Sequence, residues 1–225
     1  MSEKGNQAVK TVSFMMLITL FGKILGMVRE QLLAANYGTD MQAAAFLLAS
    51  RIPRTFFDVI FASAISASFI PVFVEYLQKK GRQEAFSLAN RFITMISTVT
   101  LLMMLLGMAF AKPLTLLIAP GYDVETVTLC VGLLRMLFPT MLFTAVAFSF
   151  VGILQSLEEF NVPAALSVVS NGVLILYYIF FNEKFGILGL TAAFLIGWAM
   201  QAVIQIPSLW KKGYHYHPDF HFKDE

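Results

Sequence analysis

Long apolar stretches, separated by short polar turns, make up most of the chain. Six of them reach the roughly 20 residues that an α-helix needs to cross the hydrocarbon core of a bilayer. None alternates apolar and polar residues as a membrane-barrel strand does, so helices are predicted. The predicted spans are residues 11–35, 41–78, 86–111, 124–155, 162–181 and 187–210.

The second stretch, residues 41–78, is too long for one straight crossing. Pro53 lies near its start, and a proline inside a helix removes a backbone donor while its ring clashes with the preceding turn. The sequence therefore predicts a kink or a break at Pro53.

Composition agrees with a membrane protein. Of the 225 residues, 58% are hydrophobic and 13% are charged, whereas a soluble domain carries about 25% charged residues. The predicted fold class is an all-α integral membrane protein, with six transmembrane helices forming a single lobe over residues 1–225. The net charge of +2 is too small to indicate nucleic-acid binding, and the single cysteine, Cys130, rules out a disulfide within the chain.

The distribution of lysine and arginine predicts an orientation, because cytoplasmic loops are enriched in both. Basic residues at one set of helix ends far outnumber those at the other, so both termini are expected in the cytoplasm. The predicted cytoplasmic residues are Lys4, Lys10, Lys79, Lys80, Arg82, Lys211, Lys212 and Lys223, with Arg91 close by, against Lys112 and Lys184 on the opposite side.

Several charged residues lie inside the predicted spans. Each costs about 2.5–3.5 kcal/mol at the centre of an isolated helix, so such residues usually face a partner or a water-filled cavity. The cations are Lys23, Arg29, Arg51, Arg54 and Arg135, and the acids are Glu30, Asp58 and Glu75.

Helix spacing groups most of these charges on the first two spans. Arg51, Arg54 and Asp58 share one face of the second span. Lys23 and Glu30 are seven residues apart on one face of the first. Arg54–Asp58 and Lys23–Glu30 are therefore predicted as neutralising pairs. The cations that remain, Arg29, Arg51 and Arg135, indicate a cavity for an anion, and the planar fork of arginine suits phosphate.

Small residues predict where helices pack closely. Gly22 and Gly26 form a small-xxx-small pattern in the first span, and such patterns let two membrane helices approach each other. Residues 62–68, ASAISAS, repeat this character on a broader face of the second span. Their predicted role is helix packing.

The sequence contains no enzyme motif. It lacks a phosphate-binding lysine loop, a metal-binding HExxH helix and a nucleophile with a plausible base, so a transporter without a cofactor is expected. All three histidines lie in residues 214–221, YHYHPDFH, without the paired spacing of zinc sites. This tail is predicted to be a flexible interfacial segment, in which Trp210, Tyr214 and Tyr216 anchor the helix end at the lipid head groups.

Four short runs resemble, in order along the chain, the MurJ/MviN lipid II flippases of the multidrug/oligosaccharidyl-lipid/polysaccharide exporter superfamily. Residues 21–30, FGKILGMVRE, are similar to the first helix of that family, and residues 64–73, AISASFIPVF, to its second. The runs APGY at 119–122 and GILQ at 152–155 also match. The resemblance covers only the first of the two six-helix lobes of such proteins.

The resemblance implies a multi-pass protein of the bacterial cytoplasmic membrane that moves the undecaprenyl-pyrophosphate-linked precursor of peptidoglycan, lipid II, by alternating access. Its implied partners are lipid II, membrane lipids and either a second lobe or a second copy. Arg29 then occupies an essential cavity position, and Lys23, Glu30 and Arg51 match charged positions of the family. The predicted cavity for the pyrophosphate and head group comprises Lys23, Arg29, Glu30, Arg51, Arg54 and Asp58. The sequence departs from the family at four positions. Ala44 stands where the family often has an acid, Arg54 where it has an asparagine, and Phe57 and Asp58 where it has paired arginines.

Two alternatives stay open. A related polysaccharide-lipid or multidrug exporter would share the fold, although a cation exporter would favour intramembrane carboxylates over arginines. A non-transporting membrane scaffold would use the buried charges only as ion pairs between helices.

Overall fold

The computed structural model describes residues 3–38 and 40–220, which contain helices and no strands. Six helical segments are long and apolar enough to cross a membrane, which confirms the all-α class with six spans. These segments are Val12–Tyr37, Met41–Lys79, Arg82–Ala109, Val124–Ser156, Asn161–Phe180 and Asn182–Lys211. Lys223, His221 and the side chain of Lys4, which entered the predictions above, lie outside the described part.

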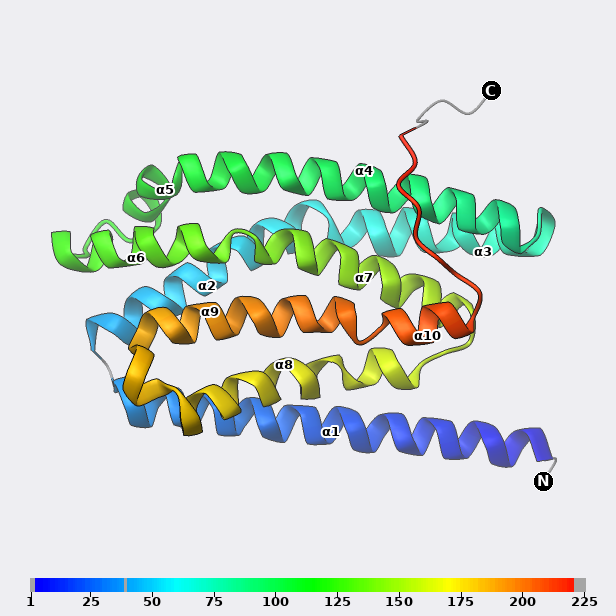
Figure 1. The fold of residues 1–225 in the computed structure, drawn as a ribbon, viewed down its shortest axis with the longest axis horizontal. Helices are drawn as coiled ribbons and strands as arrows, with labels where there is room; N and C mark the ends of the chain where they lie inside the picture. The colour runs from blue at the N-terminus through cyan, green and yellow to red at the C-terminus, as the bar shows by residue number, and fades with distance from the viewer. Residues whose placement is uncertain (1–2, 39, 221–225) are drawn as a thin grey trace.

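The spans lie side by side in one bundle (Figure 1). Helix α1 (Glu3–Tyr37) packs along α8 (Asn161–Phe180), and α8 packs against α9 (Asn182–Val203). Helix α7 (Thr140–Ser156) lies between α9 and α4 (Arg82–Ala109). Helix α2 (Met41–Ile60) packs on α6 (Val124–Leu137), and α5 (Ala111–Ile118) is a short helix between α4 and α6.

The second span is interrupted at a different place from the one predicted. Helix α2 runs through the buried Pro53, and the irregular part is Phe61 with the π-helical segment η1 (Ala64–Phe69). Helix α3 (Ile70–Lys79) follows and carries Pro71 in its first turn. Pro71 has no N–H to donate to the preceding turn, and the N–H of Ile70 bonds to Ile65 O, five residues back, so the wider turn absorbs the proline.

Two other spans are also divided. The fourth changes from α6 to α7 at Phe138 and Pro139. The sixth contains Gly186, whose φ of 53° lies in the left-handed region that glycine adopts readily, and it ends in α10 (Ile206–Lys211). The apolar pattern predicts a start at residue 187, although the helical segment begins at Asn182, because Asn182, Glu183 and Lys184 are polar.

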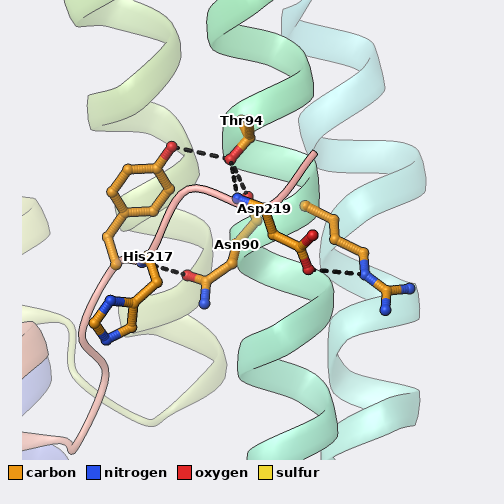
Figure 2. A network of polar contacts seen from close by, with 6 residues as sticks. Asn90, Thr94, His217 and Asp219 are labelled. Carbon is orange, nitrogen blue, oxygen red and sulfur yellow. Dashed lines mark hydrogen bonds and ion pairs between the residues drawn. The ribbon is translucent and has the colours of Figure 1, made fainter. Parts of the chain in front are cut away.

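The tail after α10 packs on α4 and buries Tyr214, so this residue is not the head-group anchor that was predicted, whereas Trp210 and Tyr216 are exposed. Asn90 Oδ1 accepts a hydrogen bond from the Tyr214 hydroxyl (2.8 Å). Figure 2 shows two further contacts of the tail: Asn90 Oδ1 accepts from the His217 N–H (3.3 Å), and Thr94 Oγ1 accepts from the Asp219 N–H (3.1 Å). Tyr214 is only 1% exposed, and burial raises the pKa of its phenol. The tail docks because Asn90 and Thr94, one helical turn apart on α4, accept its hydrogen bonds and because Arg91 between them pairs with Asp219 (3.1 Å).

The N-terminus of α6 provides a pH-dependent contact outside the spans. The Asp123 carboxylate accepts hydrogen bonds from the backbone N–H groups of Glu125 (3.1 Å) and Thr126 (3.2 Å), and with the Thr126 hydroxyl these hold the pKa of Asp123 below its usual value. A carboxyl whose pKa is lowered by folding stabilises the fold above its unfolded pKa, about 3.9, and loses this contribution as pH falls through the folded value.

We therefore expect Asp123→Ala to lower the melting temperature at pH 7, because an unfilled N-cap leaves backbone donors unpaired. The difference between this variant and the unchanged protein should shrink as pH falls below about 4. Thermal unfolding in detergent between pH 3 and pH 8 measures both effects. A difference that is constant over this range would show that the carboxylate is not the cap.

Candidate functional site

Two cavities share a charged wall formed by α1, α2 and α9. Their volumes are about 340 Å³ and about 220 Å³. The larger also reaches Tyr178 on α8, and the smaller extends to Arg54, Thr144 and Trp198. The residues that line both are Arg29, Glu30, Leu47, Ser50, Arg51 and Phe194. Because the shared wall includes two arginines from different helices, a ligand at this place would contact α1 and α2 together.

Arg29 is held from two sides. Its Nη2 lies 3.3 Å from Glu30 Oε1, and its Nη1 donates to Asn171 Oδ1 at 3.2 Å. Asn171, which is 7% exposed on α8, in turn donates from Nδ2 to the Gly22 carbonyl at 3.1 Å. Asn171 therefore joins α8 to α1 and positions the guanidinium of Arg29. The sequence analysis did not identify this residue, although a single asparagine within an apolar span was a usable signal.

Gly22 and Gly26 lie where α1 meets α8. A Cβ at Gly22 would come within 2.2 Å of Ser167 Oγ, and one at Gly26 within 3.4 Å of Asn171 Nδ2. The missing side chain at Gly22 lets the two backbones approach closely enough for Asn171 to reach the Gly22 carbonyl.

Arg54 and Asp58 form the predicted pair on α2. Arg54 Nε lies 3.0 Å and 2.8 Å from the two carboxylate oxygens of Asp58. The guanidinium also lies over the rings of Phe148 (5.7 Å to the centroid) and Trp198 (5.3 Å), and cation–π attraction favours this position. Arg54 thus connects α2 with α7 and α9.

The other predicted pair, Lys23 with Glu30, does not form. Glu30 pairs with Arg29, and Lys23 is exposed and lines neither cavity. Seven helical residues span about 10.5 Å along the axis, which is too far for a direct ion pair, whereas adjacent side chains can meet at their tips. The structure therefore does not bring Lys23 into the charged wall.

Arg135 does not join the wall either. Its Nε donates to the Met108 carbonyl at 3.2 Å, near the C-terminus of α4, where a cation is favoured by the helix dipole. In the part of the chain that the structure describes, Arg51 has no ion pair or side-chain hydrogen bond and lines both cavities. The available positive charge of the site thus resides on Arg51, with Arg29 and Arg54 partly neutralised beside it.

Replacing Asn171 by alanine should release the Arg29 guanidinium and leave the Gly22 carbonyl without its donor. Removing one partner of a buried hydrogen bond costs about 1–3 kcal/mol, so we expect a lower melting temperature in detergent. We also expect weaker binding of an anionic ligand, because Arg29 loses its fixed direction. Ser170→Ala, one position earlier on the same helix, is the control. Equal ligand binding by Asn171→Ala and the unchanged protein would contradict the proposal that Asn171 positions Arg29.

Comparison with known proteins gives one consistent family. The family model described as "Lipid II flippase MurJ" matches residues 33–225. A "Probable lipid II flippase MurJ" of Buchnera aphidicola subsp. Acyrthosiphon pisum is 31% identical over 212 residues, covering 92% of this chain and 42% of that protein. The "Lipid II flippase MurJ" of Burkholderia cenocepacia is 26% identical over 197 residues, covering 86% of this chain and 38% of that protein.

A solved structure agrees with these matches. The structure titled "Lipid II flippase MurJ, inward closed conformation" superposes with a TM-score of 0.75 at 27% identity, covering 90% of this chain and 42% of that chain. The chain thus spans about two fifths of the length of the relatives it matches.

Proposed function

The chain belongs to the lipid II flippase MurJ family, and from this premise we propose that it forms the six-helix part of a flippase that carries lipid II across the bacterial cytoplasmic membrane. The observation that supports the proposal most directly is the wall shared by Arg29 and Arg51, which are contributed by two different membrane helices. Pyrophosphate offers several oxygens to such a pair of planar, bidentate donors.

In this proposal the pyrophosphate contacts Arg51 first, since that guanidinium is not engaged by a carboxylate. Arg29 and Arg54 complete the site, held in place by Asn171 and Asp58 respectively. Glu30 limits the positive charge near Arg29. A bound head group joins α1 to α2, which have few other contacts with each other. Alternating access needs two bodies that move against each other, so transport requires a second lobe or a second copy in addition to these six helices.

The test is a binding titration of the purified chain with lipid II, using native mass spectrometry in detergent. We expect lipid II to bind, undecaprenol without the pyrophosphate to bind weakly, and a cationic drug not to compete. Binding of the drug in preference to lipid II would favour a drug exporter. A scaffold would bind none of them, and Arg29→Ala would leave its fold intact.

The MurJ relatives and the six apolar helices make the chain a multi-pass protein of the bacterial inner membrane. We propose further that both termini are cytoplasmic. The N-terminal end of α1, the α3–α4 turn and the tail lie at one end of the bundle (Figure 1), and the basic residues Lys79, Lys80, Arg82 and Lys211 belong to that end.

The orientation is tested by labelling single cysteines in intact cells. A membrane-impermeant maleimide should label the variant Lys184→Cys, at the α8–α9 turn, because this turn is expected outside the cytoplasm. It should leave Lys80→Cys unlabelled until the cells are lysed. The reverse labelling pattern would invert the proposed topology. Cys130 is buried and gives little background.

A further inference from the structure

A second, chemically different cavity lies on the outer face formed by α8 and α9. It has a volume of about 460 Å³. Its walls include Leu176, Phe181, Phe185, Gly189, Ala192 and Ile196, and none of these side chains is polar. This α8–α9 groove and the larger charged cavity both include residues of α8 and α9, but they have no lining residue in common. The groove is therefore not part of the proposed head-group site.

The apolar lining of the groove favours a hydrocarbon ligand. The one hydroxyl in its lining, that of Tyr177, donates to the Gly186 carbonyl at 2.6 Å and is not available to a ligand. Gly189 has no side chain, and a Cβ there would come within 2.4 Å of the Tyr177 hydroxyl, so the space depends on this glycine. Leu176, Phe181 and Phe185 are more than half exposed at its rim.

The dimensions fit one leaflet of a bilayer. The groove begins at the α8–α9 turn, beside Phe181 and Phe185, and both of its walls belong to membrane-spanning segments. From Ile187, directly after the kink at Gly186, to Ile196, helix α9 rises about 14 Å. Half of a hydrocarbon core about 30 Å thick is about 15 Å. A single chain that enters at the turn would therefore reach close to the middle of the membrane.

The ammonium group of Lys184 lies at the end of the groove next to the α8–α9 turn. Lys184 Nζ lies 5.4 Å from the centroid of the Phe185 ring, which lines the groove, and Lys184 has no ion pair among the residues described. Glu183 lies in the first turn of α9, where the helix dipole favours an acid. An ammonium at the mouth of a leaflet-deep apolar groove complements a phosphate attached to an acyl chain.

We propose that the α8–α9 groove is a binding site for one anionic phospholipid, with an acyl chain between Leu176 and Ala192 and the phosphate at Lys184. This lipid is a resident of the surrounding bilayer and is separate from the transported lipid. A second copy of the chain would fill the groove with side chains, but an apolar helix face would leave Lys184 without a counter-charge in the interface.

The experiment is native mass spectrometry of the purified chain with phosphatidylglycerol and with phosphatidylcholine. The unchanged protein should retain one phosphatidylglycerol with about fivefold preference, the effect of one lysine near an anionic lipid. Lys184→Gln should abolish the preference but keep the lipid. Ala192→Phe should fill the groove and lose the lipid, whereas Leu188→Phe, which adds the same ring at an exposed position outside the groove, should retain it.

Three results would overturn the proposal. One is equal retention of both lipids by the unchanged protein, and another is undiminished retention by Ala192→Phe. The third is a dimer that Ala192→Phe dissociates, because this would identify a second copy as the occupant. Melting curves of each variant establish that it is folded. Lipid II binding can fail or succeed independently, because the proposed head-group site depends on Arg29 and Arg51, which do not line the groove.

Discussion

Replacing Arg51 by glutamine is expected to weaken the binding of lipid II about 10- to 100-fold. A hydrogen bond to a charged group contributes about 1.5–3 kcal/mol, and each 1.4 kcal/mol corresponds to a factor of ten in affinity. Arg51 is exposed to the cavity and has no partner in the described part of the chain, so the loss falls on the ligand and not on the fold. The melting temperature without ligand should therefore stay nearly constant.

Lys23→Gln provides the matched control, because it removes the same charge from an exposed position that lines neither cavity. Titration with lipid II in native mass spectrometry, alongside a melting curve for each variant, separates affinity from stability. Equal losses of affinity in both variants would mean that only the overall charge attracts the ligand, and the assignment of Arg51 would fail.

The largest effect on stability is expected for Gly22→Leu. A Cβ at this position already comes within 2.2 Å of Ser167 Oγ. Ser167 can rotate away from a methyl group, but a leucine must also pass Val168, and overpacking of this kind costs about 1–3 kcal/mol. Separation of α1 from α8 also removes the Asn171 contact with the Gly22 carbonyl and so displaces Arg29. We expect both a lower melting temperature and weaker lipid II binding.

Gly132→Leu is the control for helix propensity and added bulk. Gly132 is exposed on α6, and a Cβ there meets nothing within 4 Å. Glycine is a poor helix former, so this substitution should leave the melting temperature equal or slightly higher. A decrease of equal size in both variants would show that the close approach of α1 and α8 is not what Gly22 provides.

The candidate site was only partly predictable. Arg29, Arg51 and Arg54 were found because charged residues are costly at membrane depth and therefore conspicuous in sequence. The pair Arg54–Asp58 followed from the spacing of four residues within one helix. Lys23 was included because it matches a charged position of the family and shares a helix face with Glu30. One face of a long helix covers different depths, however, and Lys23 lies away from the cavities.

The contacts between distant segments were not predictable. Asn171 reaches Arg29 across 142 positions, and Tyr214 reaches Asn90 across 124. Nothing in the local pattern around these residues specifies which helices become neighbours. The interruption of the second span illustrates the same limit: the break was predicted at Pro53, and only the backbone showed that η1 accommodates Pro71 instead.

The sequence by itself determined the membrane class, the six spans and the scarcity of intramembrane charge. The physical reason is that the bilayer imposes a length and an apolarity on each helix separately, so these properties are readable from one segment at a time. Only the tertiary structure decided that Arg51 is the unpaired arginine of the charged wall, how Asn171 fixes Arg29, where the tail docks and that an apolar groove opens beside Lys184. Each of these depends on close packing between helices, because a hydrogen bond or an ion pair exists only once two distant residues are held within about 3 Å.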